Sequence, residues 1–113
     1  MNKKAIIFGI KGLKLTKKEK YLFNKIKPWG IILFKRNIKT IKQLKKLVKE
    51  VKTIFKDKKF PILIDQEGGV VSRLDNIIDL RFFSQSFFGK LYNNDKKLFY
   101  KVYKIYINSI CEI

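Results

Sequence analysis

Apolar and polar residues alternate along this chain in blocks that suit strands and helices in turn. Residues 5–10 and 30–34 are two short apolar runs, and a third, residues 62–64, begins after Pro61. A short continuous apolar run bounded by turn residues is typical of a strand covered on both faces, as in a parallel sheet. The pattern therefore predicts three buried strands.

Helical patterns separate these strands. Thr16 and Glu19 have the T-x-x-E spacing of a capping box, which predicts a helix from residue 16 to about residue 26, ended by Pro28. Residues 40–56 show the clearest amphipathic pattern, with lysines filling the polar side. Its apolar stripe consists of Ile41, Leu44, Leu47, Val48, Val51, Ile54 and Phe55.

A last helix is expected after a polar and aromatic connection, with Asn94 as its N-cap. The residues expected to face inward in it are Leu98, Val102, Ile105 and Ile110. The order strand, helix, strand, helix, strand, loop, helix predicts an α/β fold, and right-handed crossovers would make its three strands parallel.

Candidate chemistry lies in the loops that follow the strands. Ligands of parallel α/β folds meet the loops at the carboxyl ends of the strands, and Arg36, Asp65 and Arg73 all lie on such loops. Asp65 and Arg73 can also form an ion pair that holds the loop, and the two uses are compatible. Ser84 and Ser86 have no base partner and are not candidates for a nucleophile.

Other residues of these loops have structural interpretations. We expect Glu67 to fix the loop and not to bind a ligand. Gly68 and Gly69 are expected to permit a tight turn with positive φ. Arg36 and Asn37 can serve simply to close the second loop.

Composition changes this picture little. The 113 residues carry a net charge of +18, but only three of the 27 basic residues are arginines, the better suited of the two to bidentate phosphate recognition. The lysines are spread along the chain, and A/T-rich codons explain them at least as well as a polyanionic partner. The G-x-x-G at residues 9–12 matches the nucleic-acid clamp of the KH fold only weakly, because no helix precedes it.

Several kinds of site are excluded. The chain has no histidine and a single cysteine, Cys111, so it can build no Ser-His-Asp or Cys-His arrangement and no internal disulfide. The glycine-rich phosphate-binding motifs are absent, and the Asp65–Glu67 stretch falls short of a calcium loop. We expect no cofactor and no metal. No segment approaches the ~20 apolar residues of a membrane span, so we expect a cytoplasmic protein with no membrane partner.

Three stretches together resemble a known family. They are WGIILFKRNI (residues 29–38), ILIDQEGGVVSRL (residues 62–74) and SQSFFGKLY (residues 84–92). Their order and spacing resemble the start of the catalytic barrel of glycoside hydrolase family 3. They are most similar to the bacterial β-N-acetylhexosaminidases of peptidoglycan recycling, and Asp-Gln-Glu-Gly-Gly followed by Arg is the most specific part.

This resemblance implies a (β/α)8 TIM-type barrel and a retaining hydrolase that removes terminal β-linked N-acetylglucosamine from peptidoglycan fragments. It makes Asp65 the sugar-binding carboxylate and Arg73 the substrate-binding arginine. The implied nucleophile is an aspartate late in the barrel, and the implied acid/base is a histidine on a mobile loop. Neither falls within this chain, so no catalytic residue is assigned in it.

The chain departs from the family in length, since such a barrel needs about 250 residues. Residues 1–113 are therefore expected to form a truncated, partial barrel domain of about three strand-helix units. We expect it to be inactive alone unless the rest of the barrel is supplied as a separate chain. A second class of function stays open, namely a non-catalytic basic protein that binds nucleic acid or an anionic surface.

Such a fragment would have unpaired sheet edges. The side chains of Ile31, Leu33, Ile62 and Ile64 are expected to face the barrel interior, where they would lack the strands opposite. We therefore expect the isolated chain to be loosely packed or self-associated.

Overall fold

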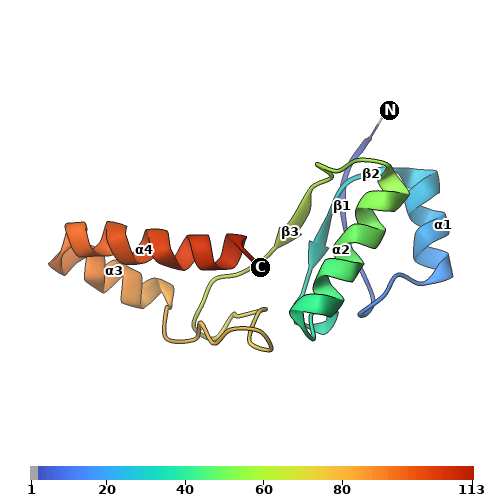
Figure 1. The fold of residues 1–113 in the computed structure, drawn as a ribbon. Coiled ribbons are helices and arrows are strands. Elements are labelled where there is room, and N and C mark those ends of the chain that lie inside the picture. Colours follow the sequence, from blue (N-terminus) through green and yellow to red (C-terminus); the bar gives the residue numbers. More distant parts are fainter. Residues whose placement is uncertain (1–2) are drawn as a thin grey trace.

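The computed structural model describes residues 3–113 and consists of an α/β layer followed by a projecting helical hairpin (Figure 1). Its elements, in chain order, are β1 (Lys4–Gly9), α1 (Lys17–Ile26), β2 (Pro28–Leu33), a 3-10 turn (Lys35–Asn37), α2 (Ile41–Phe55), β3 (Ile62–Ile64), α3 (Gln85–Asn94) and α4 (Lys96–Cys111). The prediction of an α/β fold with three strands is confirmed.

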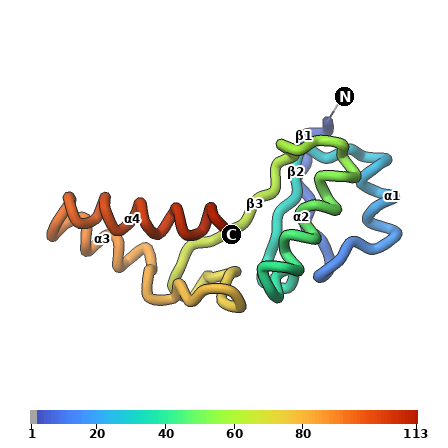
Figure 2. The backbone as a smooth tube through the Cα atoms, viewed as in Figure 1, coloured from blue at the N-terminus to red at the C-terminus, as the bar shows by residue number. Residues whose placement is uncertain are grey.

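The three strands form one parallel sheet in the order β1-β2-β3. Ile31 of β2 pairs with Phe8 of β1 on one side and with Ile62 of β3 on the other. The carboxyl ends of all three strands therefore meet at one edge of the sheet. The backbone trace shows α1 and α2 side by side against this sheet (Figure 2), and Phe23 of α1 lies 6.0 Å from Phe55 of α2, between ring centroids.

Helix α1 begins with the predicted capping box. The Thr16 hydroxyl accepts a hydrogen bond from the Glu19 amide (3.1 Å), and the Glu19 carboxylate accepts from the amides of Thr16 and Lys11, each at 2.7 Å. Burial by itself would raise the pKa of Glu19, but these hydrogen bonds outweigh it and hold the pKa below its ordinary value. The same carboxylate thus caps the helix and holds the loop after β1.

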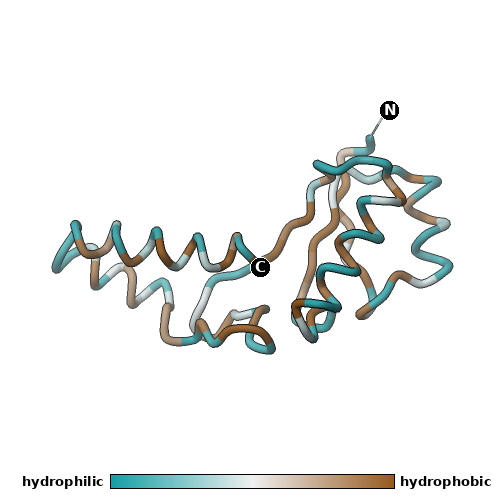
Figure 3. The backbone as a smooth tube through the Cα atoms, viewed as in Figure 1, coloured by the Kyte–Doolittle hydropathy of each residue, from teal (hydrophilic) through white to brown (hydrophobic). Residues whose placement is uncertain are grey.

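Helix α2 also follows its sequence pattern. Thr40 caps it by accepting a hydrogen bond from the Gln43 amide at 3.1 Å. Leu44, Leu47, Val51 and Phe55 are buried in the main core, whereas Ile41 at the first position is exposed. The lysines lie mostly in solvent, and Figure 3 shows the alternation of hydrophilic and hydrophobic turns along the helix.

The prediction that four strand side chains face the barrel interior, away from the helices, was wrong. Ile31 and Leu33 are buried in the same core as α2, and Ile62 and Ile64 pack against it, so all four lie on the helix-covered face. Alternation along the paired strands puts a second row on the opposite face, made up of Ile7, Ile32 and Leu63. Among residues 3–113, no helix covers this face of the sheet (Figure 2).

The region after β3 holds an extra helix that the sequence pattern did not predict. Helix α3 is capped by Ser84, whose hydroxyl accepts from the Phe87 amide at 3.1 Å. Because α3 runs to Asn94, the cap of the last helix is Asp95 and not Asn94, with its carboxylate accepting from the Leu98 amide at 2.9 Å. The prediction of Asn94 as the cap was thus wrong by one residue.

Helix α4 turns a different stripe toward α3 than expected. Tyr106 is buried, and Val102 and Ile110 pack against the core as predicted, but Leu98 and Ile105 are exposed. The contacts that decide this are aromatic: the Phe88 ring centroid lies 4.9 Å from that of Tyr103 and 5.1 Å from that of Tyr106. Edge-to-face ring pairs of this kind hold the hairpin together.

The hairpin makes the molecule long. The radius of gyration is 16.4 Å, compared with about 13 Å for a compact chain of this size. Helix α3 leads away from the sheet and α4 returns, so that the C-terminus lies near β3 (Figure 1). Among residues 3–113, no helix combines the length and the apolar composition needed to cross a lipid bilayer.

Asn37 holds together the loops after β1 and β2. Its side chain is fully buried and donates to the carbonyl oxygens of Ile10 (3.1 Å) and Gly12 (2.9 Å), while accepting from the Phe34 amide at 2.9 Å. Arg36 adds a bond from its Nε to Ile10 at 3.0 Å. The interpretation that Arg36 and Asn37 close the second loop is therefore confirmed.

We expect Asn37→Ala to lower the free energy of unfolding by about 2–4 kcal/mol, because three hydrogen bonds of a buried side chain are lost and their backbone partners lose that contact. Chemical denaturation measures this. The matched control is Asn24→Ala, whose exposed amide bonds only the Lys20 carbonyl and should change stability by less than about 0.5 kcal/mol. Equal losses for both variants would contradict the role given to Asn37.

The uncovered face and the two free sheet edges predict self-association. Ile7 is 46% exposed on edge strand β1, and an exposed apolar edge is a template for pairing with another chain. Sedimentation should show association that grows with concentration and weakens in Ile7→Lys. Tyr21→Lys on α1, a control with the same added charge, should associate like the original chain. A strictly monomeric chain would contradict this prediction.

Candidate functional site

The candidate site lies at the carboxyl end of β3. Asp65 directly follows the strand, and its Oδ2 accepts a hydrogen bond from Nη2 of Arg73 at 3.2 Å. The two side chains are 43% and 26% exposed, respectively. The structure therefore brings together the two residues that the sequence picked out, as a partly exposed ion pair.

Arg73 is positioned by residues on both sides of it. The side-chain oxygen of Gln66 accepts from the Arg73 amide at 2.8 Å, and the Gln66 amide group donates to the Ser72 hydroxyl at 3.2 Å. The Arg73 guanidinium also lies over the Phe34 ring, 5.7 Å from its centroid, within the range of a cation–π contact. Phe34 follows β2, so the site draws on two strand ends.

Arg36 lies near the same ring. Its hydrogen bond goes to the Ile10 carbonyl and not to the Asp65–Arg73 pair. Its guanidinium carbon is 4.7 Å from the Phe34 centroid. Gly9, at the end of β1, leaves the room for this arrangement, since a Cβ there would lie 3.3 Å from Nη2 of Arg36 and 3.4 Å from the Phe34 ring. The Phe34 ring thus makes cation–π contacts with both Arg36 and Arg73.

The loop between Asp65 and Arg73 folds back on itself around its two glycines. The Glu67 amide donates to the Val71 carbonyl at 3.1 Å, and Gly68 and Gly69 have φ values of +76° and +59°. The prediction of positive φ at both glycines is confirmed. Gly68 is also required by space, because a Cβ there would lie 2.0 Å from the Phe83 carbonyl oxygen.

The side chain that fixes this loop is Gln66 and not Glu67. Gln66 spans the loop to Ser72 and Arg73, whereas Glu67 is exposed and contributes its backbone amide. Glu67 therefore fixes the loop through its backbone amide alone, and the expectation that it binds no ligand stays a prediction. Gln66 could have been found from its position, since a long amide side chain in a tight polar loop can bond two backbone or hydroxyl groups at once.

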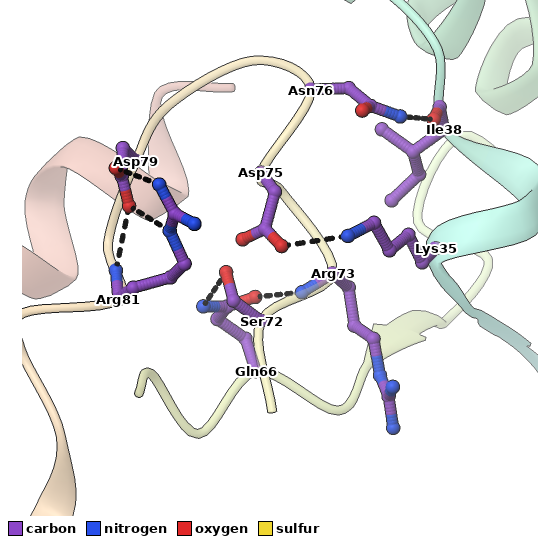
Figure 4. Close-up of polar contacts among 9 residues, drawn as sticks. All are labelled: Lys35, Ile38, Gln66, Ser72, Arg73, Asp75, Asn76, Asp79 and Arg81. Carbon is purple, nitrogen blue, oxygen red and sulfur yellow. Dashed lines mark hydrogen bonds and ion pairs between the residues drawn. The ribbon is translucent and has the colours of Figure 1, made fainter. Parts of the chain in front are cut away.

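Further contacts tie the segment after Arg73 to the loop after β2 (Figure 4). Lys35 and Asp75 form an ion pair at 2.8 Å, and the Asn76 amide group donates to the Ile38 carbonyl at 2.8 Å. The hydrogen bond from Lys35 lowers the pKa of Asp75 below its ordinary value. In Figure 4 the Arg73 guanidinium points away from the Lys35–Asp75 pair. It lies instead over the Phe34 ring.

The site keeps unused hydrogen-bonding capacity. Within the described residues, the buried Nε of Arg73 has no partner, and the Asp65 contact engages one carboxylate oxygen and one guanidinium nitrogen. A carboxylate that can still accept and a guanidinium that can still donate are suited to a ligand with hydroxyl or amide groups. Residues 3–113 contain no grouping of three or more metal-ligating side chains.

Comparisons with known proteins add a partial likeness. No family model matches the chain. A protein named Beta-hexosaminidase from Psychromonas ingrahamii is 37% identical over 70 residues, which is 62% of this chain and 20% of that protein. Its namesake from Neisseria meningitidis serogroup B is 38% identical over 68 residues, or 60% and 19% of the two chains. The chain thus spans about a fifth of the length of these relatives.

Solved structures give a similar result. NagZ from Neisseria gonorrhoeae, in complex with N-trifluoroacetyl-D-glucosamine, matches with a TM-score of 0.66 and 31% identity over 82% of this chain and 27% of that one. A family 3 β-N-acetylglucosaminidase from Paenibacillus sp. matches with a TM-score of 0.56 and 36% identity over 62% of this chain and 14% of that one. The resemblance to glycoside hydrolase family 3 enzymes of the hexosaminidase type is confirmed as a partial match. No observation favours the nucleic-acid alternative.

The contribution of the Lys35–Asp75 ion pair to stability should depend on pH. Because the pKa of Asp75 lies below its ordinary value of 3.8, the pair stabilises the folded chain above that value and loses its effect as the pH falls through the lowered pKa. An NMR titration of the Asp75 carboxyl should show a higher pKa in Lys35→Met. The control Lys39→Met, a nearby exposed lysine, should leave it unchanged, and an unchanged pKa in Lys35→Met would refute the pairing.

Proposed function

We propose that the chain is the sugar-binding N-terminal part of a retaining β-N-acetylhexosaminidase that acts on terminal β-linked N-acetylglucosamine in peptidoglycan fragments. The observation that carries the proposal is the identity of 37% to proteins named Beta-hexosaminidase. It is supported by the likeness to a NagZ that is bound to an N-acylated glucosamine. We place the protein in the cytoplasm.

Asp65 and Arg73 are the proposed substrate-binding residues. The carboxylate of Asp65 would accept hydrogen bonds from two neighbouring hydroxyls of one sugar, and the guanidinium of Arg73 would donate to the same sugar. Their present ion pair supports this role, because each group holds the other in place while keeping other atoms available. Gln66 and Phe34 would act as positioning residues for Arg73.

We propose that residues 1–113 are a partial domain of about three strand-helix units from the start of a (β/α)8 barrel, in which the α/β layer supplies three strands and the helices α1 and α2. Three features support this: the parallel order β1-β2-β3, the helices α1 and α2 on one face, and the apolar row Ile7, Ile32 and Leu63 on the other. In a closed barrel that row would face the interior, where side chains from the other strands pack.

We expect the isolated 113-residue chain to leave an aryl β-N-acetylglucosaminide unhydrolysed. These residues contain no histidine to serve as the acid/base, and binding groups alone cannot form a covalent glycosyl intermediate. A colorimetric assay with the purified chain tests this. Turnover that Asp65→Ala abolishes would refute the proposal that the catalytic residues lie elsewhere.

We expect Asp65→Asn to weaken binding of N-acetylglucosamine about tenfold or more, because charge-assisted hydrogen bonds to the sugar become neutral ones. Amide chemical shifts of Gly9, Asp65 and Arg73, followed during titration with the sugar, measure the affinity. Asp79→Asn is the matched control, since Asp79 is also an exposed aspartate paired with an arginine. Equal affinity in the original chain and in Asp65→Asn would remove Asp65 from the sugar site.

A further inference from the structure

A cavity lies between the hairpin and the loop that follows β3. It has a volume of about 480 Å³, within the range of small-molecule sites. Its residues come from the loop (Gln66 and Glu67), from α3 (Gln85, Phe88, Gly89, Tyr92 and Asn93) and from α4 (Phe99, Tyr103, Tyr106 and Ile107). Neither Asp65 nor Arg73 is among them.

The walls of this cavity are aromatic, with polar groups around them. Phe88 and Tyr106 are almost fully buried, whereas Tyr92 and Tyr103 are 37% and 40% exposed, so the latter two present ring area to a ligand. Gln85 and Asn93 supply amide groups, each of which can both donate and accept hydrogen bonds. The Gln66 side chain is already bonded to Ser72 and Arg73. Glu67 supplies one exposed carboxylate.

One polar group of the cavity has no partner. The hydroxyl of Tyr106 is buried and forms no hydrogen bond with residues 3–113. The residue as a whole is only 7% exposed. The hydroxyl lies against the turn of the loop, 3.2 Å from where a Cβ on Gly68 would stand, which is next to the cavity wall made by Gln66 and Glu67. A buried hydroxyl without a partner is rare in proteins, and a ligand group is one way to satisfy it.

We propose that this cavity, here called the hairpin pocket, binds a saccharide. A sugar ring has an apolar C–H face, which packs on aromatic faces such as those of Tyr92 and Tyr103. It also has a rim of hydroxyls that donate and accept, which matches the amide groups of Gln85 and Asn93 and the Tyr106 hydroxyl. The predominance of neutral amides over charged groups favours a neutral ligand over an ammonium ion, for which a single exposed carboxylate is a weak counter-charge.

This inference goes beyond the proposed function, because it holds whether or not Asp65 and Arg73 bind sugar. The experiment is an NMR titration of the ¹⁵N-labelled 113-residue chain with N,N′-diacetylchitobiose at up to about 10 mM, where a ligand with a millimolar Kd fills most sites. We expect saturable shifts of the amides of Gly89, Asn93 and Tyr103, which line the hairpin pocket.

Tyr106→Phe is the decisive variant, since it removes only the hydroxyl. It should weaken the hairpin titration about three- to tenfold, the effect of one hydrogen bond. Tyr100→Phe makes the same change at an exposed tyrosine of the same helix, outside the pocket, and should have no effect. Asn93→Ala, judged by its amide dispersion to be folded, is a second loss-of-binding variant.

Two further arms separate this proposal from others. Asp65→Asn should leave the hairpin shifts intact even where it abolishes those of Gly9 and Arg73. Tetramethylammonium chloride, a cationic probe, should cause no hairpin shifts. The proposal is overturned by any of four results: no hairpin shifts with the sugar, hairpin shifts that Asp65→Asn abolishes, binding of the cation alone, or a spectrum showing that α3 and α4 do not pack together.

Discussion

The buried side chain of Asn37 is the contact on which the arrangement of this molecule most depends. Parallel strands place their carboxyl ends together, but the loops that leave them must still be held against one another. Asn37 does this by bonding the carbonyls of Ile10 and Gly12 across the loop after β1 and the amide of Phe34 at the end of β2. Because Phe34 is fixed in this way, its ring can support the Arg73 guanidinium from the third loop.

The third loop illustrates how a charged site is built with little burial. Asp65 and Arg73 are partly exposed, so the ion pair itself contributes little to stability. Their geometry comes from neutral contacts instead: the Gln66 side chain, the Ser72 hydroxyl and two glycines with positive φ. The ion pair is therefore a product of the loop fold, which leaves its charges available to a ligand.

The lysine excess has a structural explanation that needs no polyanionic partner. The lysines of α2 lie mostly in solvent on the face opposite the core, as a soluble amphipathic helix requires. Arg36 and Arg73, by contrast, both lie over the Phe34 ring at the ends of the strands. Two of the three arginines thus lie at the candidate site.

Local sequence determined the elements that rest on local physics. The Thr16 and Thr40 caps, the amphipathic stripe of α2 and the glycine turn in the third loop depend on residues a few positions apart, so they could be read from the chain. The pairing of Asp65 with Arg73 was also within reach, because the two lie on one short loop.

Tertiary structure decided what depends on distant neighbours. Helix α4 carries two apolar stripes, one with Leu98 and Ile105 and one with Tyr106, and the rings of Phe88 and Tyr103 selected the second. Asn94 and Asp95 are equally good caps by chemistry, and the end of α3 chose between them. Ile31 and Leu33 are apolar and would suit either face of the sheet. Only the packing of α2 decided which face they lie on. In each case several arrangements satisfy the local preferences, and the packing of segments far apart in the chain selects one of them.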